Sequence, residues 1–141
     1  MQPPAWAGAF VGIPYRDFGR GRDACDCWGL VRLVLRERAG IDLPAYCIAP
    51  DDAEAVQAAI AGERVGPWQR IALDDVRPLD VAEMAAPARV GGRVQFAPLH
   101  VGVIVGGGWL LHSERHIGSA LVRLADKAIA RRIEGIWRHV A

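Results

Sequence analysis

One apolar helix, introduced by a polar loop, constrains this chain more than any other feature. The turn-rich loop 15–23 precedes apolar residues at helical spacing, which predicts a helix from Cys27 to about Ala39 that ends at Gly40. Cys27 then stands at a helix N-terminus, where unpaired N–H groups and a partial positive charge favour a nucleophilic thiolate. The alternative interpretation is that Cys27 is a buried, inert thiol.

A second segment, residues 99–114, supplies the other groups that a nucleophilic thiol needs. Two β-rich apolar runs flank Gly106–Gly108, which predicts a hairpin with His100 in one run and His112 in the other. Cysteine catalysis combines a thiol, an imidazole that takes its proton and a polar group that orients the imidazole. The histidines share a face if the turn has three residues, or if a bulge corrects a two-residue turn. Otherwise each is an ordinary surface or core histidine.

Three short blocks give the chain a resemblance to a known family. They read Gly-Ile-Pro-Tyr-Arg-Asp-Phe-Gly at 12–19, Asp-Cys-Trp-Gly-Leu-Val at 26–31 and His-Val-Gly-Val-Ile at 100–104. In this order they resemble the NlpC/P60 cysteine peptidases of bacterial cell-wall turnover, over roughly residues 5–140. The short form with Trp28 is similar to the peptidases encoded with phage tails and gene-transfer agents.

The resemblance implies three catalytic residues. Cys27 would be the nucleophile, His100 the general base and later the general acid, and His112 the group that orients the His100 imidazole. The reaction that this implies needs no metal and no organic cofactor.

Three further residues would position the substrate or the oxyanion. The Tyr15 hydroxyl and the Cys27 backbone N–H would hold the oxyanion, although Tyr15 is alternatively a packed turn residue. Asp26 would lie beside the substrate or serve as a helix N-cap. Trp28 stands where the family often has Ser or Gly, and its indole would narrow the groove or offer a docking surface.

Length, composition and net charge limit the number of domains and the classes of partner that the chain can have. Its 141 residues, of which 52% are hydrophobic, predict a single globular domain over residues 1–141. A net charge of +1 gives no electrostatic case for a nucleic-acid partner. The N-terminal segment 1–11 lacks a basic region and is too short for a signal peptide or a membrane span. We therefore expect synthesis in the cytoplasm and incorporation into a phage-like tail or particle.

The odd number of cysteines, at positions 25, 27 and 47, argues for a reducing compartment and against a disulfide scaffold. One alternative is a zinc site formed by Cys25, Cys27, His100 and His112. A second is a reversible disulfide between Cys25 and Cys27. Simple packing of Cys25 and Cys47 is preferred to both.

The order of elements, helices first and then an antiparallel sheet, predicts an α+β fold. It is also the papain-like arrangement that the resemblance implies, with N-terminal helices packed on the sheet. Helices are expected at 3–11, 27–39 and 51–61, the last with Asp51 or Asp52 near its cap and Gly62 after its end, and a helical turn at 125–131. Strands are expected at 70–73, 79–84, 92–96, 100–105, 109–114, 121–124 and 133–139.

These features favour a thiol hydrolase that cleaves amide bonds in peptidoglycan stem peptides, assembled with phage-like tail-tip or baseplate proteins. One alternative is a catalytically silent structural or peptidoglycan-binding tail-tip component. Another is a thiol amidase or acyltransferase acting on lipids, which the lack of a basic amphipathic helix disfavours.

Overall fold

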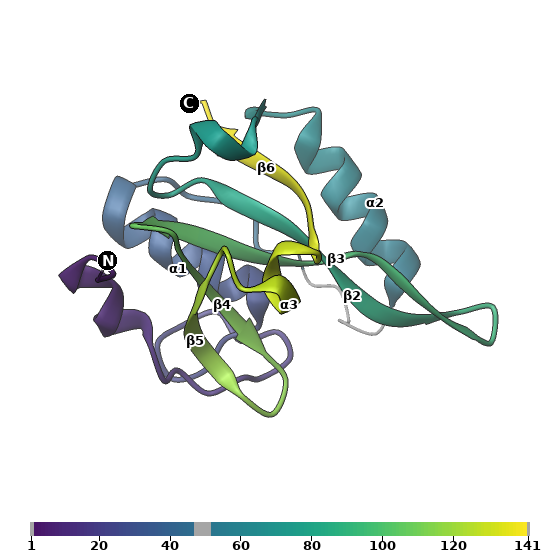
Figure 1. Ribbon diagram of the computed structural model, residues 1–141. Coiled ribbons are helices and arrows are strands. Elements are labelled where there is room, and N and C mark those ends of the chain that lie inside the picture. Colours follow the sequence, from purple (N-terminus) through teal and green to yellow (C-terminus); the bar gives the residue numbers. More distant parts are fainter. Residues whose placement is uncertain (1, 47–51, 141) are drawn as a thin grey trace.

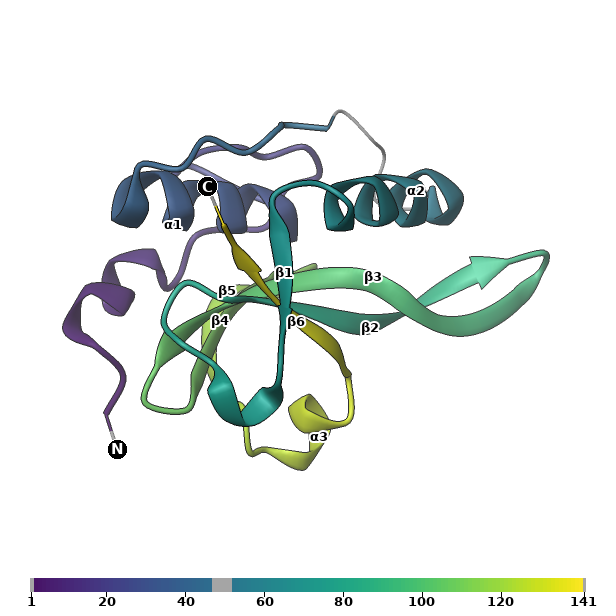
Figure 2. The ribbon, with the colours of Figure 1, turned by 90° about the horizontal axis from the view of Figure 1, so that it is seen from above.

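The computed structural model describes residues 2–46 and 52–140 (Figure 1). Within these residues one antiparallel sheet has the strand order β1-β6-β2-β3-β4-β5. Helices α1 and α2 cover one face of the sheet and α3 lies on the other (Figure 2), which confirms the predicted α+β fold. The elements are the 3₁₀ helix η1 (Ala5–Phe10), α1 (Cys27–Ala39), α2 (Ala53–Arg64), β1 (Trp68–Ile71), the 3₁₀ helix η2 (Leu73–Asp75), β2 (Val81–Val90), β3 (Arg93–Gly106), β4 (Trp109–Glu114), β5 (Gly118–Arg123), α3 (Lys127–Ala130) and β6 (Ile133–His139).

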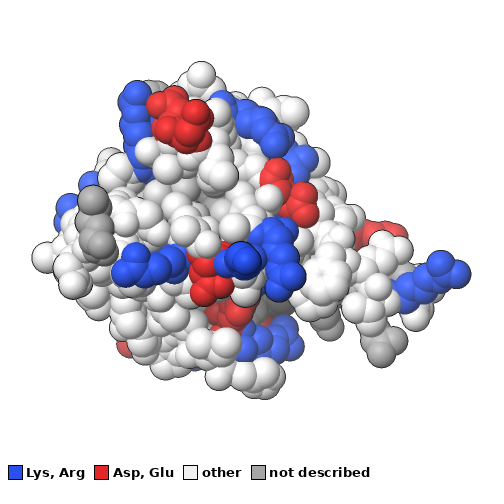
Figure 3. All heavy atoms as spheres, viewed as in Figure 1, with Lys and Arg blue, Asp and Glu red and all other residues white. Residues whose placement is uncertain are grey.

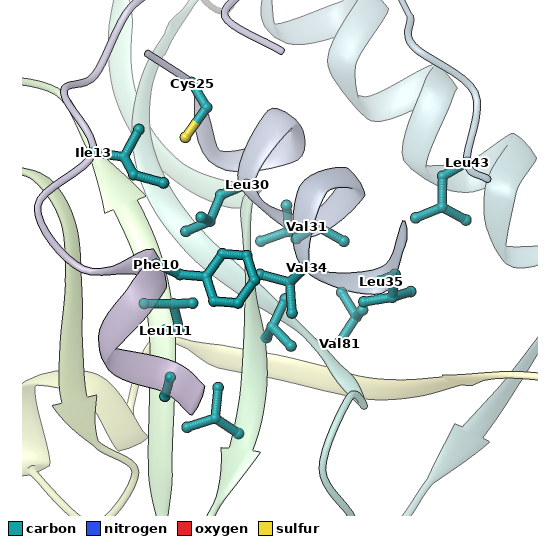
Figure 4. Close-up of a cluster of buried hydrophobic side chains, with 14 of the residues drawn as sticks. Phe10, Ile13, Cys25, Leu30, Val31, Val34, Leu35, Leu43, Val81 and Leu111 are labelled. Atoms are coloured by element: carbon teal, nitrogen blue, oxygen red, sulfur yellow. The ribbon is translucent and has the colours of Figure 1, made fainter. Parts of the chain in front are cut away.

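Helix α1 has the predicted bounds because a specific residue closes each end. The Asp26 side chain accepts a hydrogen bond from the Gly29 N–H at 2.7 Å, which caps the N-terminus. Gly40 adopts a left-handed φ of 67°, and its N–H bonds carbonyls of the last turn. The buried face of α1 forms a core with η1, the loop before α1 and the sheet (Figure 4), and this core includes Phe10, Ile13, Cys25, Leu30, Val31, Val34, Leu35, Val81 and Leu111.

Helix α2 departs from the prediction at its C-terminal end. Asp52 caps it as expected, accepting from the Ala55 N–H at 3.1 Å, while Asp51 lies outside the described residues. Gly62 was predicted to follow the helix, but it lies inside and α2 continues to Arg64. Tertiary contacts explain the extension, because the Glu63 carboxylate binds Tyr46 and Trp68 while Arg64 pairs with Glu83. The described residues contain no helix long and apolar enough to cross a membrane.

The hairpin of β2 and β3 is longer than predicted and projects beyond the rest of the sheet (Figures 1 and 2). The expected strands 92–96 and 100–105 are one continuous strand, although Pro98 interrupts the sequence pattern. Pro87 is tolerated because β6 pairs with β2 only as far as Met84 and the last backbone bond on this edge is from the Ala85 N–H to Arg132, so no N–H is needed at position 87. The register of the β2–β3 pair shifts between Met84, which is opposite His100, and Ala85, which is opposite Pro98. Leu99, the residue before His100, is therefore the extra residue of a bulge in β3.

The turn between β3 and β4 determines whether the two histidines meet. Gly106 pairs with Trp109 across a two-residue turn, so the three-residue turn is not formed. A register shift between Ile104 and Gly106 then brings Gly102 opposite His112. The bulge alternative is therefore the one realised, and His100 and His112 share a face of the hairpin.

The remaining elements follow the predictions with shifted ends. The predicted helix at 3–11 is the shorter η1, and α3 forms within the helical turn expected at 125–131. Strands β4 and β6 have the predicted bounds, whereas β1 begins two residues before the predicted strand 70–73 and β5 begins three before 121–124.

Candidate active site

Cys27 opens helix α1 and lines a cavity of about 880 Å³ that reaches from α1 and α2 across to the β2–β3 hairpin and β4. His100 lines the same cavity, and so do three of the residues expected to surround the nucleophile, Tyr15, Asp26 and Trp28. The Cys27 thiol has a hydrogen bond from the backbone of Val101, the residue that follows His100. The structure therefore brings the thiol and the β3 imidazole, which are far apart in the sequence, to one side of one cavity.

The surroundings of the Cys27 thiol oppose the thiolate that the helix N-terminus favours. The residue as a whole is partly exposed, but its sulfur is buried. This burial, together with the adjacent negative charge of Asp26, raises the pKa of Cys27 to about 12. Hydrogen bonds from the Val101 and Trp28 backbones act in the opposite direction, but they do not outweigh burial.

His100 and His112 form a direct hydrogen-bonded pair. The distance from His100 Nε2 to His112 Nδ1 is 2.8 Å, and the rings are tilted by 73°. Burial lowers the pKa of His100 well below its ordinary value, with His112 and Arg132 adding to the shift. Burial likewise lowers the pKa of His112. Both imidazoles are thus neutral near pH 7, and His100 Nδ1 is the ring nitrogen that the pair leaves unused.

Two charged residues that sequence reasoning missed lie beside this pair. Glu114 Oε1 is 3.8 Å from His100 Nε2 and 3.8 Å from His112 Nδ1, and it accepts Arg132 Nη1 at 2.6 Å. A signal for Glu114 was present, because it lies two residues after His112 on β4 and alternation places it on the same face. Arg132 comes from the turn before β6, and no local pattern links it to the histidines.

Asp26 has a structural role, as the N-cap alternative proposed. Its Oδ1 accepts from the Gly29 N–H and from Arg20 Nη1, each at 2.7 Å, and its Oδ2 accepts from the Phe18 N–H at 3.2 Å. Arg20 also donates to the carbonyl oxygens of Ala45 and Tyr46, at 2.8 and 2.9 Å from Nη2. Asp26 therefore joins the loop, the nucleophile helix and the segment after the helix, and both of its oxygens are engaged.

Two aromatic residues line the cavity together with Cys27: Tyr15 lies in the loop before α1, and Trp28 lies in the first turn of α1. Burial raises the pKa of Tyr15 to about 12, so its hydroxyl stays protonated and able to donate. Trp28 donates from Nε1 to the Pro44 carbonyl at 2.7 Å, and its ring lies 5.9 Å from that of Tyr46. The indole thereby fastens the segment after α1 against the start of the helix while lining the cavity.

Among the described residues, Cys25 and Cys27 form no disulfide, and neither belongs to a group of possible metal ligands. Cys25 and Cys27 are both free thiols, and Cys25 is fully buried, which raises its pKa to about 11. Cys47 lies outside the described residues. In the part of the chain that the structure describes, the donor group close enough to share a cation is His100, His112 and Glu114, without either cysteine. Arg132 already occupies that carboxylate, so the group does not favour a metal ion.

Charged side chains on the face seen in Figure 3 are intermixed in sign rather than gathered by sign. Blue and red groups alternate across this view, and the net charge of the chain is +1.

Comparison with solved structures shows the fold. The chain resembles a protein described as similar to a lipoprotein of the NLP/P60 family from Staphylococcus aureus, with 22% identity and a TM-score of 0.63, over 96% of this chain and 40% of that one. It resembles the NlpC/P60 domain of the peptidoglycan hydrolase SagA, with 18% identity and a TM-score of 0.60, over 95% of this chain and 93% of that one. NlpC1 from Trichomonas vaginalis gives 18% identity and a TM-score of 0.60, over 93% of this chain and 41% of that one.

Sequence comparison identifies the family. A search of curated proteins finds no match to this chain. The profile of the NlpC/P60 family, in contrast, matches residues 12–138, a range that contains the nucleophile helix, the histidine hairpin and β6. The chain belongs to the NlpC/P60 family.

Proposed function

We propose that this protein is a cysteine peptidase that cleaves amide bonds in the stem peptides of peptidoglycan, with residues 1–141 acting as one peptidase domain. The observation that carries the proposal is the 2.8 Å hydrogen bond between buried His112 and His100, which lines the same cavity as Cys27. Family membership supports a hydrolase of the cell wall, since a solved relative of similar fold is named a peptidoglycan hydrolase.

The reaction starts from a neutral thiol and a neutral imidazole. Cys27 Sγ attacks the carbonyl carbon of the scissile amide while its proton passes to His100 Nδ1, because Nε2 is already bonded to His112. The His100 Nε2–H donates a hydrogen bond to His112 Nδ1, and this bond fixes the tautomer and the ring plane of His100. The imidazolium then protonates the leaving amine, and the C–N bond breaks to give a thioester.

Water completes the cycle. His100 takes a proton from the water, whose oxygen attacks the thioester carbon, and the proton is returned to the Cys27 sulfur as the C–S bond breaks. The products are a carboxylic acid, which ionises at neutral pH, and the free thiol. In both tetrahedral intermediates the oxyanion is stabilised by the Cys27 backbone N–H at the start of α1 and by the protonated Tyr15 hydroxyl.

The decisive experiment compares wild type with Cys27→Ala for the release of soluble muropeptides from purified sacculi, with products identified by mass. Wild type is expected to release fragments that Cys27→Ala does not. Cys25→Ala is the matched control, because it removes a neighbouring buried thiol that has no part in the reaction. Release by Cys27→Ala at the wild-type rate would rule out the proposed mechanism.

We further propose that the peptidase acts within a phage-like or gene-transfer-agent tail tip, a role supported by the resemblance of its short form with Trp28 to the peptidases encoded with such particles. Co-elution of the wild-type and Cys27→Ala proteins with tail particles on a sizing column tests this assembly. Elution apart from the particles would contradict it. The competing function, a catalytically silent tail component, predicts co-elution without any release from sacculi.

A further inference from the structure

We propose that Glu114, held in place by Arg132, is a positioning group that stabilises the proton carried by the His100–His112 pair during catalysis. The inference rests on the proposed function, because that proton is the one which leaves the Cys27 thiol. It adds a charged pair, Glu114 and Arg132, to the thiol and the two imidazoles.

The position of the Glu114 carboxylate relative to the histidine hydrogen bond is the first argument. Its Oε1 lies 3.8 Å from each of the two ring nitrogens that share the 2.8 Å bond. A distance of 3.8 Å is too long for a hydrogen bond, but it is short enough for a strong electrostatic interaction with a charged ring. Glu114 therefore leaves the donor and acceptor of the histidine bond in place, and it sets a negative charge beside whichever ring carries the positive one.

The anchoring of Arg132 is the second argument. Its Nη1 is 2.6 Å from Glu114 Oε1, and its Nε donates to the Ala85 carbonyl at 3.0 Å. The Arg132 carbonyl in turn accepts from the Ala85 N–H at 2.6 Å. Ala85 follows directly after the register shift in the β2–β3 pair, and both its N–H and its carbonyl are bonded to Arg132. The guanidinium is thus fixed from two sides, and it fixes the carboxylate.

The two members of the pair act on the histidines with opposite sign. Near the His100 ring lie His112 and Glu114 from β4 and Arg132 from the turn before β6, and Cys27 lines the same cavity from α1. Other charged or titratable residues that line this cavity are Tyr15, Asp26, Arg64, Glu83 and Arg115. Glu114 raises the pKa of His112, whereas Arg132 lowers the pKa of both histidines. Holding Glu114 between Arg132 and the imidazoles therefore points the negative end of the pair at the site where the imidazolium forms.

Glu114→Gln and Arg132→Gln test this arrangement on a soluble stem-peptide substrate. Glu114→Gln is expected to lower kcat about tenfold with little change in KM, since the substituted group acts on the proton and not on the substrate. It should move the acid limb of kcat/KM to lower pH. Arg132→Gln should move that limb to higher pH, and the double variant should fall between them.

A carboxylate–arginine pair away from the cavity provides the control. Glu37 binds Arg22 at 2.6 Å on the surface, so Glu37→Gln removes an equivalent ion pair and should leave the pH profile unchanged. Thermal melting of each variant checks the fold. A loss of activity caused only by structural damage would not move the acid limb in opposite directions for the two substitutions.

Titration of the His100 ring by NMR needs no turnover. It therefore tests the effect of Glu114 and Arg132 on the histidines separately from the proposed peptidase function. If the wild type does not cleave but the His100 pKa falls in Glu114→Gln and rises in Arg132→Gln, the proposed function fails and the charge coupling stands. If the wild type cleaves but neither the acid limb nor the NMR titration shifts in opposite directions, the inference is overturned.

Discussion

Replacement of Gly29 by alanine should destabilise the protein, although alanine is the better helix former. Gly29 lies in the first turn of α1, where a Cβ atom would overlap the carbonyl oxygen of Gly19. The same atom would lie 3.1 Å from the Gly19 carbonyl carbon and 3.2 Å from Asp26 Oδ1. These neighbours cannot move easily, because the Gly19 carbonyl is held by the Asp26 N–H at 3.3 Å and by Arg20 at 2.9 Å.

The expected magnitude combines two opposing terms. Glycine to alanine in an open helix position stabilises by about 1 kcal/mol. Forcing a methyl group against fixed backbone costs about 3 kcal/mol, the upper part of the range for overpacking. The net loss in the free energy of unfolding for Gly29→Ala is then about 2 kcal/mol, which corresponds to a melting temperature lower by roughly 6–8 °C.

Gly62 offers a matched control for the assay, which is thermal and urea unfolding followed by circular dichroism. It is also a helical glycine, in α2, but an added Cβ would meet no atom within 4 Å. Gly62→Ala should therefore raise the free energy of unfolding by about 0.5–1 kcal/mol. The reasoning is refuted if Gly29→Ala is as stable as wild type, or if Gly62→Ala loses as much stability as Gly29→Ala.

Three further predictions concern the thiol and the histidines. His100→Ala should abolish muropeptide release, whereas His112→Ala should retain some, because an orienting group contributes less than the base; a reversed ranking would exchange the roles. Since burial raises the pKa of Cys27 to about 12, alkylation of its thiol by iodoacetamide should accelerate steadily from pH 6 to 9, and a plateau reached below pH 6 would indicate a resting thiolate. Burial lowers the pKa values of His100 and His112, so the unfolded chain takes up protons first and stability present above pH 6.5 is lost below it. Urea unfolding should show a slope of up to about 1.4 kcal/mol per pH unit for each histidine, reduced in His100→Ala, and a pH-independent stability would contradict this.

Local patterns predicted the elements that carry the nucleophile and the base. The bounds of α1 follow from Asp26 and Gly40, whose capping chemistry depends only on adjacent backbone. The hairpin of β3 and β4 was likewise evident from its glycines. Whether His100 and His112 share a face was left open, because it depended on a bulge between Ile104 and Gly106 that the glycine run does not encode.

Features that depend on tertiary contacts were not predictable in the same way. Gly62 is normally a helix-ending signal, and α2 passes through it because Glu63 and Arg64 find partners on other elements. The neutral state of Cys27 also required the structure, since the helix N-terminus alone argues for a thiolate and burial reverses the sign. Arg132 reaches Glu114 only after the final strand has been placed in the sheet.

The position of β6 between β1 and β2 has a consequence for when the sheet is completed during synthesis. Both neighbours of this strand precede it by many residues, so the ribosome releases them before the strand that joins them exists. The sheet behind the thiol therefore stays divided until residues 133–139 have emerged and inserted, and such long-range pairing is slow. Until β6 pairs with β2, β1 has no strand beside it among the described residues, and Arg132, which directly precedes β6, is not yet in place beside Glu114.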